Sequence, residues 1–88
     1  MHTKQEIASE VRQAITDQAG YINSEITDEK RLEIDLCLDK LDVVELVMNV
    51  EESFNIEISE EEAEKVNTVG DLIGIVTRKL EEKGQVAA

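Results

Sequence analysis

The chain has 88 residues, enough for one small domain, and it carries 21 acidic against 9 basic side chains, a formal net charge of -12. This excess of acid disfavours binding to nucleic acid or to an anionic membrane, because both select basic surfaces, and it favours basic protein partners. No signal segment or membrane-length apolar run is visible, and the single cysteine, Cys37, cannot form a disulfide within the chain. We therefore expect a reducing, cytoplasmic location.

The first predicted helix runs over about residues 4–18. Thr3 and Glu6 have the spacing of a capping box, and Gly20 is placed to end the helix. Apolar residues recur between them at the spacing of one helix face: Ile7, Val11, Ala14 and Ile15. The only histidine, His2, precedes this helix at an expected mobile terminus, so no histidine pair on an ordered element supports catalysis.

Residues 21–38 form a long connection that is too rich in aliphatic side chains for a disordered linker. We expect an ordered loop that plugs the bundle, with Leu32 and Leu36 pointing inward. Near its end, Cys37 is more typical of a half-buried small apolar residue than of a reactive thiol. The acidic run over residues 28–35 lacks the spacing and central glycine of a calcium loop, and no metal site is predicted.

The helix predicted over residues 39–54 has two apolar faces. Asp39 is expected to cap it, with Asp42 as an acidic residue in its first turn. One face forms a core stripe of Val43, Leu46, Val47, Val50 and Phe54. The opposite face carries Leu41, Val44 and Met48, rimmed by Glu45, Glu51 and Glu52. Because a helix packed on one side needs only the first stripe, the second favours docking on a basic partner; burial by a loop or another helix is the alternative.

Two further capping signatures follow. Ser59 and Glu62 open a short third helix, and Thr68 and Asp71 open a last one. Inward positions are expected at Ala63 and Val66, and then at Val69, Leu72, Ile73, Val76 and Leu80. Three long helices and one short one, without strands, predict an all-α antiparallel four-helix bundle over residues 1–84, followed by a flexible C-terminal tail over 85–88.

The run from Asp39 to Met48 resembles the modification site of acyl carrier proteins, in which Asp-Ser-Leu-(Asp/Glu) is followed by a Val-Glu-Leu-Val-Met helix. The run from Glu51 to Asp71 is also similar to that family, and the likeness extends without a gap from about Val11 to the last helix. The departure is Lys40, which stands where the family has the serine that carries 4′-phosphopantetheine.

This resemblance implies a non-catalytic carrier of thioester-tethered acyl intermediates in fatty-acid, polyketide or related biosynthesis. The implied partners are the basic surfaces of acyl-processing enzymes and a phosphopantetheinyl transferase, with the chain itself a monomer. By resemblance, the site-flanking and partner-docking residues are Asp39, Leu41, Asp42, Val44, Glu45, Met48, Glu51, Glu52 and Ile58. An attached acyl chain would thread between helices lined by Leu46, Val50 and Val66.

Lys40 changes the expectation for the prosthetic group. The family joins its arm through a phosphodiester to a serine oxygen, whereas lysine at pH 7 is an ammonium ion without a free lone pair. We therefore predict that 4′-phosphopantetheine is absent from position 40. No other serine lies in an Asp-Ser-Leu setting: Ser9, Ser24, Ser53 and Ser59. The alternative to a cargo carrier is an arm-less module that docks on biosynthetic enzymes. Lys40 itself can be natural or introduced, and an unusual modification at another residue is the third explanation.

Overall fold

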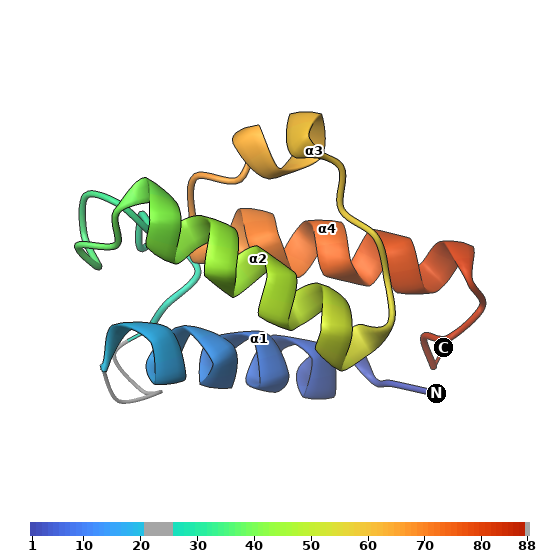
Figure 1. The fold of residues 1–88 in the computed structure, drawn as a ribbon. Coiled ribbons are helices and arrows are strands. Elements are labelled where there is room, and N and C mark those ends of the chain that lie inside the picture. Colours follow the sequence, from blue (N-terminus) through green and yellow to red (C-terminus); the bar gives the residue numbers. More distant parts are fainter. Residues whose placement is uncertain (21–25, 88) are drawn as a thin grey trace.

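The computed structural model describes residues 1–20 and 26–87, and in them it contains four helices (Figure 1). In chain order these are α1 (Lys4–Ala19), α2 (Lys40–Phe54), α3 (Glu60–Glu64) and α4 (Val69–Glu82). The described part of the chain forms no strand, and its only extended pairings are two isolated bridges. The predicted all-α class, with three long helices and one short, is confirmed. Ser24 and the first part of the predicted connection lie outside the described residues.

Each helix begins with a capping box. The side chain of the capping residue accepts a hydrogen bond from the backbone N–H three positions on, and the side chain of that later residue accepts one from the backbone N–H of the capping residue. The four predicted pairs are all confirmed: Thr3 with Glu6, Asp39 with Asp42, Ser59 with Glu62, and Thr68 with Asp71. Gly20 and Asn55 take left-handed conformations that end α1 and α2, with φ of 81° and 54°. Local sequence therefore sets most helix boundaries.

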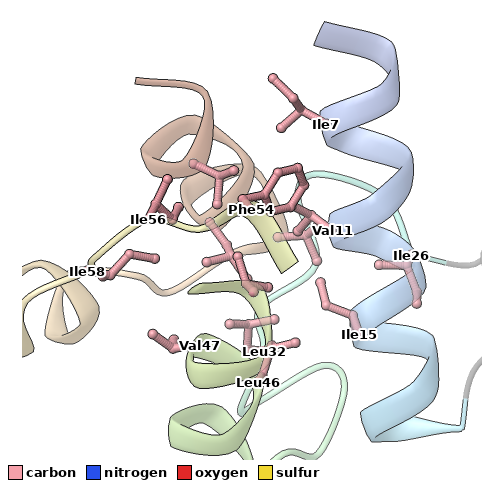
Figure 2. Close-up of a cluster of buried hydrophobic side chains, with 14 of the residues drawn as sticks. Ile7, Val11, Ile15, Ile26, Leu32, Leu46, Val47, Phe54, Ile56 and Ile58 are labelled. Atoms are coloured by element: carbon pink, nitrogen blue, oxygen red, sulfur yellow. The ribbon is translucent and has the colours of Figure 1, made fainter. Parts of the chain in front are cut away.

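The core is a single, largely aliphatic cluster in which α1 packs against both α2 and α4. Figure 2 shows α1 presenting Ile7, Val11 and Ile15 to this cluster, and all three are fully buried. From α2 and α4 the cluster takes Leu46, Val47, Val50, Phe54, Val69, Leu72, Val76 and Leu80. Partly buried residues at its edge include the predicted inward positions Ala14, Val43, Ala63, Val66 and Ile73.

The described part of the α1–α2 connection is ordered by contacts with two helices. Arg12 of α1 donates from Nε to the Ile26 carbonyl at 3.0 Å and pairs with Asp28 at 2.6 Å. The backbone N–H of Gly70 donates to the Asp28 carbonyl at 2.9 Å, and a Cβ at position 70 would lie only 3.2 Å from that oxygen. The connection therefore packs closely against the first turn of α4, where a side chain at position 70 would be crowded.

The predicted plug residues of this connection are confirmed: Leu32 is 1% exposed and Leu36 is 4% exposed. Cys37 differs from the expectation, because it is exposed and takes a left-handed conformation with φ of 58°. Leu36 and Leu38 on either side of it are buried, and the reversal at Cys37 turns its own side chain outward. Cys37 is therefore a surface thiol, not a half-buried apolar residue.

The two ends of the chain lie together in the structure. The backbone N–H of His2 donates to the Gln85 carbonyl at 2.8 Å, and that of Ala87 donates to the His2 carbonyl at 2.7 Å. The His2 ring meets Phe54 edge to face, with ring centroids 5.4 Å apart, and Val86 packs against the core. Residues 85–87, expected to form a flexible tail, and His2, expected at a mobile terminus, are thus joined by backbone hydrogen bonds in the structure.

Candidate docking face and the start of α2

The start of α2 is fixed by the capping box and by the connection that precedes it. Asp39 Oδ1 accepts the N–H of Asp42 at 2.8 Å, and Asp42 Oδ2 accepts the N–H of Asp39 at 3.1 Å. Just before them, Leu38 is buried and its N–H donates to the Leu32 carbonyl at 3.1 Å. These bonds leave Lys40, the first residue of α2, exposed to solvent.

The second apolar face of α2 points out of the bundle. Its three residues are among the few large apolar side chains that are exposed, at 67% for Leu41, 53% for Val44 and 54% for Met48. On the opposite side of the same helix, Leu46 and Val50 are fully buried. Burial of the outward face by a loop or another helix, the alternative considered from the sequence, is absent among the described residues. We call Leu41, Val44 and Met48 the outward face of α2.

The acids that rim this face differ in their surroundings. Glu45 is exposed and its Oε2 accepts a long hydrogen bond from Gln18 Nε2 at 3.3 Å, while Glu52 is exposed. Glu51 is half-buried, and its Oε2 accepts the backbone N–H of Ile58 at 2.9 Å. Glu45 and Glu52 are therefore free to meet a partner, whereas Glu51 also supports the fold.

Ile58 does not share the outward face on which the resemblance placed it. Its side chain is only 8% exposed and belongs to the core cluster, and Figure 2 labels it at the edge of that cluster. The physical reason is that the chain after α2 turns back across the bundle, so that Ile56 and Ile58 both enter the core. No local sequence pattern indicated that Ile58 is buried, because its burial depends on where the segment leading to α3 packs.

The predicted acyl-pocket residues lie where packing is tight. Leu46 and Val50 are fully buried in the core cluster, and the half-buried Val66 packs against it from the segment between α3 and α4. The described part of the chain forms one hollow of about 510 Å³ between the start of α1 and the end of α4, and another of about 450 Å³ beside the ends of α2 and α4. Neither hollow is lined by Leu46, Val50 or Val66.

The side chains at the start of α2 do not fit a serine-linked prosthetic group. Position 40 offers an ammonium group where a phosphodiester needs a hydroxyl oxygen. The Ser59 hydroxyl is engaged elsewhere, since it accepts the N–H of Glu62 at 3.2 Å. In the described residues no group of histidine, cysteine and carboxylate side chains could hold a metal ion, and none of their helices is long and apolar enough to cross a membrane.

Comparison with known sequences identifies relatives over nearly the whole chain. Residues 9–76 match the family model described as the phosphopantetheine attachment site. The chain is 44% identical over 78 residues to the acyl carrier protein of an Exiguobacterium species, covering 89% of this chain and 99% of that protein. It is 38% identical over 80 residues to the acyl carrier protein of Thermotoga maritima, covering 91% of this chain and 99% of that protein.

Solved structures give the same result for the fold. The acyl carrier protein of Enterococcus faecalis matches with a TM-score of 0.76 at 31% identity, over 88% of this chain and 98% of that one. The crystal structure of the Thermotoga maritima acyl carrier protein matches with a TM-score of 0.78 at 31% identity, over 91% and 93% of the two chains. With the helical bundle, the acid-rimmed outward face and these matches, the chain belongs to the acyl carrier protein family.

Proposed function

We propose that this chain is a non-catalytic member of its family that docks on acyl-processing enzymes of fatty-acid, polyketide or related biosynthesis through the outward face of α2. One observation carries the proposal. A single helix buries four of the five residues of one apolar stripe and leaves a second stripe at least half exposed, beside the exposed acids Glu45 and Glu52. A small protein gains no stability from such an exposed cluster, so contact with a partner is its better explanation.

The chemistry of this face defines the partner. Leu41, Val44 and Met48 supply exposed apolar area, and removing such area from water favours association with a partner. The acidic rim and the net charge of -12 attract a basic surface over a distance and orient it. Binding should therefore weaken with rising salt. A monomeric state and a cytoplasmic location belong to the same proposal, the latter supported by the single cysteine.

Lys40 determines whether docking delivers a cargo. Because position 40 has no hydroxyl, we propose that the chain as it stands docks without a 4′-phosphopantetheine arm. The second candidate is a cargo carrier, which the family match across this position favours. It applies if Lys40 was introduced at a position where the natural chain has serine. The two candidates differ at one residue and share the docking face.

Loading can be tested directly by mass. The chain and its Lys40→Ser variant are incubated with coenzyme A and a broad-range phosphopantetheinyl transferase, and the intact masses are compared. We expect no gain for the chain itself and a gain of one prosthetic group, at position 40, for the variant. A gain on the unaltered chain, whether on Lys40 or on a serine, would rule out the arm-less function. An unloaded variant would show that more than position 40 departs from a carrier.

Docking can be tested separately by reversing charge. Replacing Glu45 and Glu52 by lysine should weaken binding to a carrier-recognising enzyme by at least about tenfold, because both acids face solvent beside the apolar cluster. The matched control replaces two exposed acids elsewhere, Glu10 of α1 and Glu82 of α4, and changes the net charge equally. Equal weakening by both pairs would show that only total charge matters. Lost helicity in the first pair would show that the face is structural.

A further inference from the structure

The segment of residues 58–66, which contains α3, connects α2 to α4, and Figure 1 shows α3 at the top of the bundle, above α4. It is called the strap below. Its helix has only five residues, none of them buried, and a helix this short has little stability of its own. Apart from Ile58 at its start, the strap offers the core only the half-buried Ala63 and Val66. Apolar packing is therefore a weak explanation for its position.

One carboxylate joins the strap to α4. Glu62 Oε1 lies 2.9 Å from Lys79 Nζ and accepts the N–H of Ser59 at 3.0 Å, while Glu62 Oε2 lies 2.7 Å from Arg78 Nη2. The side chains of Glu62 and Lys79 are 24% and 23% exposed, so these two groups are partly shielded from water. The Lys79 ammonium and then the Ser59 N–H hold the pKa of Glu62 at about 2. Glu62 thus stays ionised between two cations.

A second carboxylate joins the start of the strap to α2. Glu51 Oε2 accepts the N–H of Ile58 at 2.9 Å, in a partly buried position. The apolar residues at this side of the core are also its less deeply buried members: Ile58 is 8% exposed and Val47 is 5% exposed, and both appear at the edge of the cluster in Figure 2. Displacement of the strap would therefore take Ile58 out of the core and uncover its neighbours.

We propose that the strap is a conformational device held closed by the carboxylates of Glu51 and Glu62, and that it opens locally when their charge interactions are weakened while the rest of the bundle stays folded. Dissolved salt then acts in opposite directions on two parts of the molecule. It screens the ion pairs of Glu62 and loosens the strap. It also relieves the mutual repulsion of a chain with net charge -12, which stabilises the three long helices.

Amide hydrogen exchange tests this proposal. Glu62→Gln keeps an oxygen that can complete the capping box but removes the charge, and a second variant replaces Arg78 and Lys79 by glutamine. We expect amide exchange in the strap to become about tenfold faster in both variants, with the protection of α1 and α4 retained. The matched control is Glu61→Gln, an exposed acid on the same helix that forms no salt bridge among the described residues, and it should change nothing.

Salt and the second carboxylate provide independent measurements. The second measurement compares 0.5 M sodium chloride with a buffer of about one fifth that salt concentration. At the higher concentration the amides of the strap in the unaltered chain should exchange faster, and those of α1 more slowly. The faster exchange of the strap should be absent in Glu62→Gln. Glu51→Ala should speed exchange of the Ile58 amide, whereas Glu52→Ala should not. Unchanged strap exchange in both charge variants, or strap amides that exchange only with global unfolding, would overturn the proposal.

Discussion

Two leucines on α2 allow the outward and inward faces to be compared by the same substitution. Leu46 is fully buried in the core cluster, whereas Leu41 is 67% exposed. Leu46→Ala removes buried methyl and methylene groups and leaves a cavity, which costs about 2–5 kcal/mol. Leu41→Ala removes groups that are already mostly in water, and we expect the free energy of unfolding to change by no more than about 0.5 kcal/mol.

These magnitudes are large on the scale of this protein. At roughly 0.05–0.15 kcal/mol per residue, a chain of 88 residues has a free energy of unfolding of about 4–13 kcal/mol. A loss of about 3 kcal/mol from Leu46→Ala should lower the Tm by about 12–24 °C, since each kcal/mol corresponds to about 4–8 °C in a domain of this size. The Tm of Leu41→Ala should stay within a few degrees of the unaltered chain.

Urea and thermal unfolding followed by circular dichroism measure both effects, and binding to a carrier-recognising enzyme gives the complementary result. Leu41→Ala should weaken binding at unchanged stability. Leu46→Ala, measured well below its Tm, should bind nearly as the unaltered chain does. If Leu41→Ala instead destabilised the fold by more than about 2 kcal/mol, the outward face would be covered in solution and the reasoning from its exposure would fail.

Two further predictions concern the carboxylates that cap helices. Asp39→Ala should lower the free energy of unfolding by about 1 kcal/mol in urea titrations, because the N–H of Asp42 loses its acceptor. Asp39→Asn should retain most of the stability that the cap contributes, because asparagine also has an acceptor oxygen. The pKa of Glu62 is lowered from 4.5 to about 2, so its contribution to stability is fully present above about pH 4.5 and is lost as the pH falls through about 2. An NMR titration of its side-chain carboxyl should show a midpoint near 2, and a midpoint near 4.5 would contradict the ion pair with Lys79.

Helix positions could be predicted from sequence because their signals are local. A capping box spans only a few residues, and the spacing of Ile7, Val11 and Ile15 already defines one face of a helix. The two faces of α2 follow in the same way from the angles between its residues. Such patterns need no knowledge of the rest of the chain, and the structure reproduces them.

The features that could not be predicted depend on contacts between distant segments. The alternation of Ile56 and Ile58 does not show how deeply each is buried, and the bond from Ile58 to Glu51 forms only once the chain has turned back after α2. His2 pairs with Val86, at the opposite end of the chain, where no local pattern connects them. Cys37 takes a left-handed conformation usually found at glycine or asparagine, and its sequence neighbours give no signal for it.

Lys40 shows how the requirements of the fold separate from those of the chemistry. A cation in the first turn of a helix opposes the helix dipole, at a cost of about 0.3–1 kcal/mol, but Asp39 and Asp42 stand beside it with the opposite charge. The lysine is exposed, and the capping bonds of Asp39 and Asp42 form without it. Nothing in the folding of α2 therefore requires serine at this position. Only attachment of the arm requires it, so the bundle and the outward face form without a hydroxyl at position 40.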